Sequence, residues 1–329
     1  MKSKIIFSLV AFAAIFLSAC QKDFTVETTT ARVDSTITPT TSDSVYLDRY
    51  YYIEINSSGA NGLDTGIRTH YQYDNLKRVK IICDTINEPF FSAIKTYEKI
   101  EYFYNGNDTL PNKRISYWYK YSSVPALPGS RDTAVSFYTY NINGKIILDS
   151  TIESGLTFPS TNHLHKYINN FSYSDNKIIS LMQKTNLLST TGLGLERLHR
   201  DTLTLDAIGN VTSSKIQSVY FYPSNSSNYA AYNFTYDNKQ SPVSKQNIKQ
   251  LYNYFYNRST DLPIRFGFTP YNNLVSTQEV NGPIVNGNFA NSISYNAKGF
   301  PFLLLLNYPV TPTNFFPYSD KFTFIYKAL

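Results

Sequence analysis

The amino-acid sequence predicts an all-β protein, an antiparallel up-and-down meander of about nine hairpin units with roughly 18 strands. Three observations support this fold class. The chain has 29 Tyr and 22 Phe but only 16% charged residues, a composition that suits pleated, half-buried surfaces. A strand–turn–strand pattern recurs at intervals of 27 to 36 residues, as in repeat architectures. No long segment of the sequence shows a helical period.

The first element is an export signal over residues 1–19. Lys2 and Lys4 precede an apolar stretch, residues 5–17, that is too short to span a bilayer comfortably. Residues 17–20, LSAC, resemble the lipobox of bacterial lipoproteins. The resemblance implies cleavage before Cys20 and acylation of Cys20, which would anchor the chain because each buried methylene contributes about 0.8 kcal/mol. The alternative is an ordinary secretory signal that ends in Cys.

Residues 20–44 are expected to form a lipidated tether. The stretch 21–44 holds eight Thr and three Ser and cannot bury enough apolar surface to offset its chain entropy. Residues 21–23, QKD, resemble a tag that sends some lipoproteins of one Gram-negative group to the outer face of the outer membrane, although Phe24 departs from that tag.

Two triplets in the tether, Asp34-Ser35-Thr36 and Asp43-Ser44-Val45, resemble the Asp-Ser/Thr-apolar O-glycosylation sequon of the same bacteria. The resemblance makes Ser35 and Ser44 the candidate acceptors. For the later triplets we favour a structural role, in which Asp ends a turn and a β-branched residue begins a strand. These triplets begin at Asp84, Asp108, Asp132, Asp149 and Asp201.

The repeat is anchored on one aromatic or apolar residue in each unit. In residues 171–179, FSYSDNKII, Phe171 and Tyr173 share one strand face with a small residue between them. In three units an Asx residue follows the anchor and Gly stands three positions later, a type I turn preference in which Gly supplies positive φ. Each unit therefore predicts a hairpin tip. The anchors are Tyr73, Tyr104, Tyr140, Tyr173, Leu205, Tyr236, Phe268, Tyr295 and Tyr326.

Residues 45–329 are expected to form a single repetitive β domain. Its strands could form a large twisted sheet, a spiral shell or a barrel. The units resemble those of YD-repeat proteins, and more closely those of uncharacterised lipoproteins built of degenerate YD-like units. The chain departs from that pattern at Leu205 and Phe268. A transmembrane barrel is a less favoured alternative, because Lys99 and Glu101 lie on one face of a predicted strand and Glu98 lies on the other.

Few residues qualify as a functional site. Trp118 shares a predicted strand face with Ser116 and Lys120, where it could stack on a sugar or a partner, while the odd-numbered residues 115–121 are expected to face the core. His163 and His165 share a face but lack an obvious third ligand, so we expect no metal site. Cys83, without a partner once Cys20 is acylated, is expected to be a small buried apolar residue.

The sequence therefore predicts a non-enzymatic, lipid-anchored protein of the outer membrane, on the cell-surface side or alternatively the periplasmic side. Its aromatic-rich sheet would serve binding or structure. One alternative is a glycan-binding module of a polysaccharide-uptake system, with a glycan or a surface protein as partner. A periplasmic hydrolase is the other, although no nucleophile motif supports it. The formal net charge is +6, but the Lys and Arg residues do not cluster in the sequence, which argues against a nucleic-acid partner. No cofactor is expected.

Overall fold

The computed structural model describes residues 45–56, 67–87, 94–122, 130–157, 161–189, 194–221, 226–249, 251, 271–281, 289–307 and 318–329. These residues form sixteen antiparallel strands: β1 (Val45–Asn56), β2 (Ile67–Tyr73), β3 (Val79–Asn87), β4 (Ile94–Phe103), β5 (Lys113–Ser122), β6 (Ser130–Tyr140), β7 (Ile146–Thr157), β8 (Thr161–Ser174), β9 (Lys177–Asn186), β10 (Leu195–Leu205), β11 (Val211–Tyr220), β12 (Ser226–Gln240), β13 (Asn272–Asn281), β14 (Phe289–Tyr295), β15 (Pro301–Asn307) and β16 (Tyr318–Ala328).

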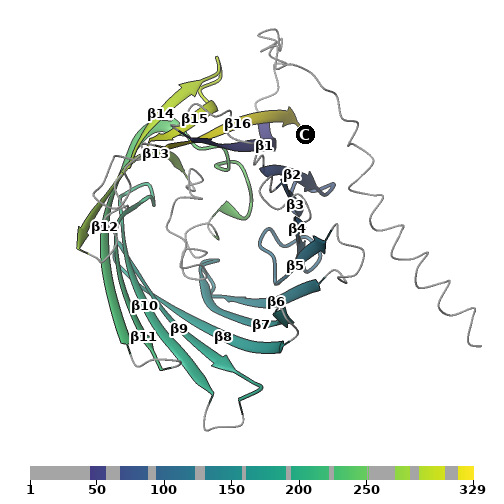
Figure 1. Cartoon of the computed structure of the whole chain (residues 1–329). Coiled ribbons are helices and arrows are strands. Elements are labelled where there is room, and N and C mark those ends of the chain that lie inside the picture. Colours follow the sequence, from purple (N-terminus) through teal and green to yellow (C-terminus); the bar gives the residue numbers. More distant parts are fainter. Residues whose placement is uncertain are drawn as a thin grey trace, which may run out of the picture. The chain divides into compact units, whose positions relative to one another are not determined.

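The sheet closes into a barrel in which each strand pairs with its chain neighbours and β1 pairs with β16 (Figure 1). The closing pair runs from Val45 opposite Ala328 to Asn56 opposite Tyr318. Asp48 lies at a bulge in β1, where its carboxylate is 2.8 Å from the Lys327 ammonium on β16. Of the three closures left open by the sequence, the barrel is thus the one adopted, and it removes both sheet edges.

The all-β meander is confirmed, but the strand count is sixteen among the described residues, where the sequence predicts roughly eighteen. Seven anchors lie at or near the ends of even-numbered strands, and Leu205 ends β10. The ninth anchor, Phe268, lies outside the described residues. Between β12 and β13 the described residues 241–249 form successive turns and not a strand of a hairpin.

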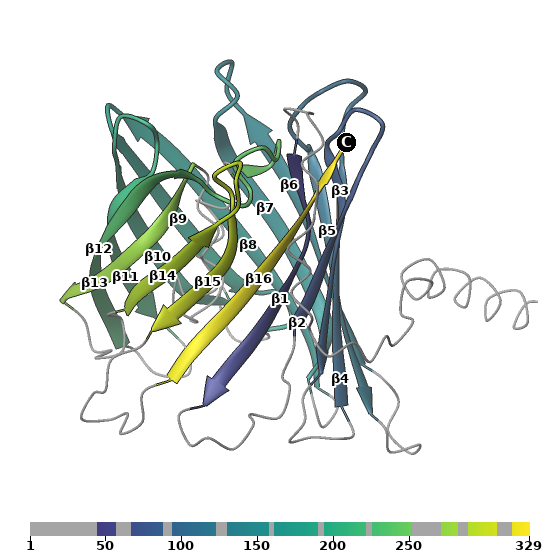
Figure 2. The ribbon, with the colours of Figure 1, turned by 90° about the horizontal axis from the view of Figure 1, so that it is seen from above.

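Six of the predicted hairpin tips are confirmed, those that follow Tyr73, Tyr104, Tyr140, Tyr173, Leu205 and Tyr295. They lie together at one end of the barrel, which we call the tight-turn end (Figure 2). At Asn141 the side-chain Oδ1 accepts hydrogen bonds from the backbone N–H groups of Asn143 and Lys145, and Gly144 has φ of 71°. Residues 171–179 form the tightest tip, in which Ser174 pairs directly with Lys177. The repeat therefore encodes turns that all close at the same end.

The anchor tyrosines also join neighbouring strands at this end. Each of six hydroxyl groups donates a hydrogen bond, 2.6 or 2.7 Å long, to a backbone carbonyl at or near the start of the preceding strand. Leu205 has no hydroxyl to donate, and its backbone N–H instead bonds the carbonyl of Asn176. The six pairs are Tyr73 to Leu47, Tyr104 to Val79, Tyr140 to Pro111, Tyr173 to Ile146, Tyr236 to Val211 and Tyr326 to Pro301.

Residues 241–249 and Leu251, which we call the strap, cross the lumen at the tight-turn end. The strap leaves β12 and reaches β3 and β4, where Asn247 accepts a hydrogen bond from the Val79 N–H and donates to the Tyr104 hydroxyl. Its buried side chains Val243, Ile248 and Leu251 join a hydrophobic cluster to which strands on all sides of the barrel contribute. The tight-turn half of the lumen is therefore filled by apolar side chains.

Burial alternates along the strands and shows which face is inside. On β5, Arg114 and Ser116 are 6% and 1% exposed, whereas Ile115 is only partly buried. The expectation that the odd-numbered residues 115–121 face the core is therefore wrong for the described side chains, Ile115 and Tyr117. The reason is that the interior of a wide barrel admits small and polar groups, so large apolar residues do not mark the inner face.

Two of the later Asp triplets, those at Asp149 and Asp201, differ from the expectation that Asp ends a turn, whereas Asp108 closes a turn with Asn105. Asp149 and Asp201 lie in the middle of β7 and β10 and are 5% and 0% exposed. Each is hydrogen-bonded inside the barrel: Thr151 donates to Asp149, and Ser214 donates to Asp201. A buried carboxylate needs such partners. We call the buried polar side chains of these strands and of β11 the polar layer; they include Asp149, Thr151, His199, Asp201, Ser214 and Ser218.

Candidate functional site in the barrel lumen

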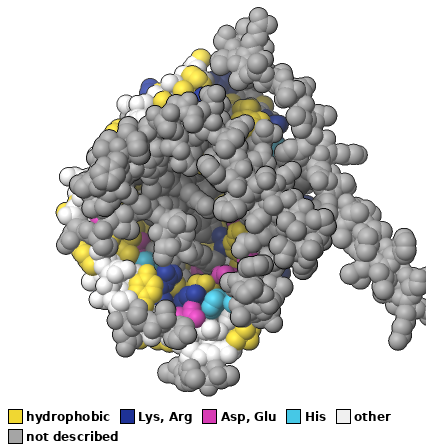
Figure 3. All heavy atoms as spheres, viewed as in Figure 1, with side chains coloured by type: hydrophobic (Ala, Val, Ile, Leu, Met, Phe, Trp, Pro, Cys, Tyr) yellow, Lys and Arg dark blue, Asp and Glu magenta, His cyan; other side chains and the backbone are white. Residues whose placement is uncertain are grey.

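The half of the lumen away from the tight turns is lined by charged and histidine side chains. Figure 3 shows Lys or Arg, Asp or Glu, and His side chains gathered along one wall of a hollow. On β8, His163 and His165 have the same parity as the buried Asn169 and Phe171, so both rings face the lumen. The predicted shared face of the two histidines is confirmed, and their rings stack with centroids 5.4 Å apart.

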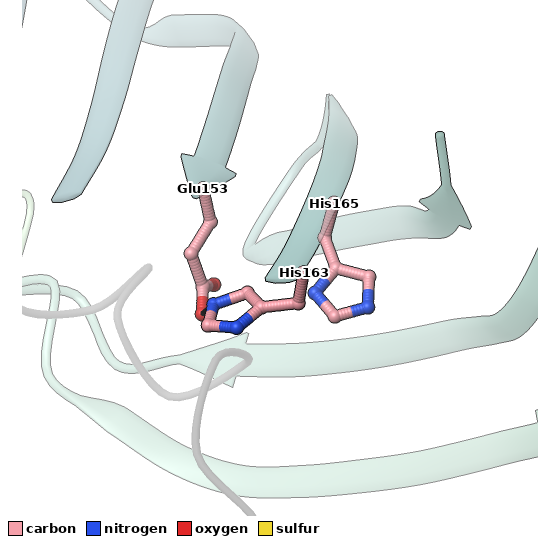
Figure 4. Close-up of side chains that lie close together, drawn as sticks. All are labelled: Glu153, His163 and His165. Atoms are coloured by element: carbon pink, nitrogen blue, oxygen red, sulfur yellow. Dashed lines mark ion pairs between the residues drawn. The ribbon is translucent and has the colours of Figure 1, made fainter. Parts of the chain in front are cut away.

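Glu153 on β7 completes a group of three donor residues with the two histidines. Strand pairing places Glu153 opposite His165, and its Oε1 lies 3.6 Å from Nε2 of His163. One ligand atom from each of the three residues lies within 4.8 Å of the other two. Figure 4 shows the carboxylate of Glu153 beside the ring of His163, with His165 next to it on the same strand. Two imidazoles and one carboxylate are donor types that bind transition metals.

An ion pair flanks the histidines on the next two strands. Nζ of Lys184 on β9 lies 2.8 Å from Oε2 of Glu196 on β10, and the same carboxylate oxygen is 3.4 Å from Nε2 of His165. Partial burial and the Lys184 charge lower the pKa of His165 below its ordinary value, so its ring is neutral near pH 7. Burial acts to raise the pKa of Glu196, but the Lys184 hydrogen bond and charge hold it below its ordinary value.

Gly155 makes room for the His163 ring and for one further group beside it, the Asp132 carboxylate. It pairs with His163 across β7 and β8. A side chain at Gly155 would collide with the Asp132 carboxylate and the His163 ring, because a Cβ there would lie 1.9 Å from Oδ1 of Asp132 and 2.8 Å from Cε1 of His163. The absence of a side chain thus lets Asp132 and His163 approach the same point in the lumen.

Trp118 lies on the lumen-facing side of β5, together with the buried Ser116. It pairs with Asp132 on β6 and with Glu98 on β4. The sequence placed Trp118 beside polar groups, and the structure adds that it lies in the same part of the barrel wall as Asp132, the neighbour of His163. Its role in ligand stacking stays a prediction.

Three other candidate residues fall outside the described part of the chain: Cys20, Ser35 and Ser44. Cys83 is buried on β3 with 6% exposure, as expected for a small apolar side chain. The other two histidines are separate from the cluster. His70 lies 3.5 Å from Asp48 at the barrel seam, and His199 is hydrogen-bonded to Ser218 in the polar layer.

Sequence reasoning missed Glu153, Asp132, Lys184 and Glu196 as neighbours of the histidines. The search for a third ligand considered only histidines and cysteines, and these four residues reach the site through strand pairing. The position of Glu153 in the sequence did indicate this neighbour, because a hairpin that turns just after residue 157 places Glu153 opposite His165. Using it requires the register of the hairpin, which the alternation of side chains alone does not fix.

No protein-family model matches the chain, and no curated protein matches it. Among solved structures, the barrel is similar to a porin-like protein from Bacteroides vulgatus, with 10% identity and a TM-score of 0.49, covering 87% of this chain and 100% of that one. It is also similar to a porin-like protein from Bacteroides uniformis, with 11% identity and a TM-score of 0.45, covering 85% and 98% of the two chains.

Within the described ranges, no helix has both the length and the apolar character needed to cross a membrane.

Proposed function

We propose that this chain is a non-enzymatic, lipid-anchored protein of the outer membrane whose barrel binds a ligand in the polar half of its lumen. The observation that carries this proposal is the division of the interior. The tight-turn half is filled by the hydrophobic cluster and the strap, whereas the other half presents Trp118, Asp132 and the charged pair Lys184 and Glu196. A barrel filled at one end suits a binding site better than a through channel.

The outer wall supports anchoring by lipid rather than by spanning the bilayer. Arg200, Lys215 and Gln217 are exposed in the middle of β10 and β11, on the face opposite the buried Asp201 and Ser214. A basic residue facing lipid at the bilayer midplane costs about 2–4 kcal/mol. Polar residues on this part of the outer wall are consistent with attachment through an acylated Cys20.

The anchor is tested by fractionating cells that make the unmodified protein, Cys20→Ala or the matched control Cys83→Ala. We expect the unmodified and Cys83→Ala chains in the outer-membrane fraction and Cys20→Ala in the soluble fraction. Cys20→Ala that stays in the membrane would overturn lipid anchoring and revive a spanning barrel.

Protease treatment of intact cells, followed by an immunoblot for the barrel, tests the side of the membrane. We expect loss of the signal, as the QKD stretch implies. Protection until the outer membrane is opened would place the barrel on the periplasmic side and redirect the search to periplasmic partners.

A glycan is the ligand class that Trp118 favours, because an indole face stacks on sugar rings and nearby carboxylates accept hydrogen bonds from hydroxyl groups. The test is binding to a polysaccharide panel by the parent, Trp118→Ala and Phe137→Ala. Phe137 is 52% exposed on the outer wall and serves as a matched aromatic control. Loss of binding in Trp118→Ala alone supports a lumen site, and loss in Phe137→Ala alone moves the site outside. Chelator-sensitive hydrolysis of a panel member would replace this proposal with the hydrolase alternative.

A further inference from the structure

We propose that Glu153, His163 and His165 form a binding site for a divalent transition-metal ion, of the zinc type, in the wall of the barrel lumen. This site does not depend on the lipid anchor or on a glycan ligand. It is carried by the geometry of the donor atoms, by the carboxylate that faces one histidine, and by the space that Gly155 leaves.

The spacing of the donor atoms suits one ion. Two ligand atoms about 2.1 Å from a tetrahedral zinc ion lie about 3.4 Å apart. Nε2 of His163 and Oε1 of Glu153 are 3.6 Å apart, close to that separation, and all three donor atoms fall within 4.8 Å of one another. Small side-chain rotations on two paired strands would therefore bring them onto a common centre.

His165 has the arrangement of a metal-ligating histidine. Its Nε2 faces the carboxylate of Glu196 at 3.4 Å, and Glu196 is held in place by Lys184. Its other ring nitrogen, Nδ1, is buried and has no hydrogen-bond partner within the described part of the chain. A ligating imidazole typically binds the ion through one nitrogen and donates from the other to a carboxylate, which fixes the ring. Nδ1 is thus the donor atom that His165 offers.

A further carboxylate lies beside His163. The Asp132 carboxylate approaches the His163 ring over the bare backbone of Gly155, and its oxygen can complete a four-ligand shell or accept a hydrogen bond from a metal-bound water. Glu196 is paired with the ammonium of Lys184, whereas Glu153 lies against Nε2 of His163. The carboxylates of Glu153 and Asp132 would offset the charge of a bound divalent cation.

The donor set also selects the class of ion. Imidazole nitrogen with carboxylate oxygen suits Zn²⁺, Co²⁺, Ni²⁺ and Cu²⁺. Ca²⁺ and Mg²⁺ prefer shells made of oxygen, so we expect them to bind far more weakly. Zn²⁺ is accordingly the probe of choice, with Ca²⁺ as the negative control.

The experiment is a calorimetric titration of Zn²⁺ into the full-length protein, purified in detergent and stripped with a chelator. We expect one ion per chain and no heat from Ca²⁺. His163→Ala and His165→Ala should each weaken binding by at least about 100-fold, and Glu196→Gln by about 10- to 100-fold, the effect of losing an outer partner. His70→Ala is the matched control, because it removes a histidine beside a carboxylate elsewhere, and its affinity should not change.

Unaltered affinity in the His163→Ala and His165→Ala chains, or no binding by the parent, overturns the proposal. Circular dichroism tests whether each variant is folded. If the variants do not fold, the visible spectrum of Co²⁺ added to the parent decides: four-coordinate absorption with nitrogen ligands supports the site, and the spectrum of hydrated Co²⁺ refutes it. Neither readout requires a glycan or a cell surface, so failure here is distinct from failure of the proposed function.

Discussion

Replacing Asp201 with Asn should change the free energy of unfolding in a pH-dependent way. Relative to the parent, the variant should gain stability as the pH rises. Asp201 is fully buried on β10. Its Oδ1 accepts a hydrogen bond from Ser214, 2.8 Å away, while Oδ2 has no hydrogen-bond partner among the described residues. Burial raises the pKa of this carboxyl to about 7, against an ordinary value of 3.8. The protein therefore buries a group that is charged only at the upper end of the physiological range.

The sign of the effect follows from this direction. Because the folded state holds its proton to a higher pH than the unfolded state, the stability that neutral Asp201 provides is fully present below pH 3.8 and declines as the pH rises towards 7. The full loss corresponds to about 4 kcal/mol, at about 1.36 kcal/mol for each pH unit. Asn cannot ionise, so the variant escapes this decline while all other titrating groups stay the same.

The assay is urea unfolding of the parent and Asp201→Asn between pH 4 and pH 8, followed by circular dichroism. We expect the difference in unfolding free energy, variant minus parent, to rise by up to about 4 kcal/mol over this range. A second variant, Ser214→Ala, keeps Asp201 but removes the hydrogen bond that favours its charged form. In this variant the loss of stability with rising pH should extend to higher pH than in the parent. A difference that stays flat from pH 4 to pH 8 would refute the reasoning.

Three further expectations concern the tight-turn end, each measured by urea unfolding. Tyr173→Phe should cost about 1 kcal/mol by removing the hydroxyl bond to Ile146; an equal loss in exposed Tyr229→Phe would contradict this. Gly299→Ala should cost about 1–2 kcal/mol, because φ is 78° and no atom lies near the added methyl group; an unchanged stability would show that the turn rearranges. Asn247→Ala should cost about 2–3 kcal/mol and speed amide exchange of its partner on β3; unchanged exchange would show that the strap does not hold the rim.

The hairpin tips were predictable because their causes are local. An Asx side chain that caps its own turn, a Gly with positive φ, and two large residues separated by one small residue all act within ten residues of chain. Asn141, Gly144 and Asp206 behave as the sequence predicts. The hydroxyl bonds of the anchor tyrosines were not predicted, because their acceptors lie 25 to 29 residues earlier in the chain.

The candidate site was only half predictable. His163 and His165 share a face in any strand, so their pairing was evident. Their third donor depends on the register of β7 against β8, and the outer partner Glu196 depends on two further pairings through β9. The inner face of β5 was assigned wrongly because alternation identifies two faces but does not say which of them encloses a lumen.

The sequence by itself determined the all-β class, the repeated hairpin and the position of its turns, because backbone propensities and side-chain alternation are properties of neighbouring residues. Only the tertiary structure decided that the sheet closes, with Val45 opposite Ala328, and which residues meet inside it. Closure pairs residues as far apart in sequence as Val45 and Ala328, and no local preference specifies such a contact. This closure turns one face of every strand into a lumen, and the register of β7 against β8 brings Glu153 to the two histidines on that face.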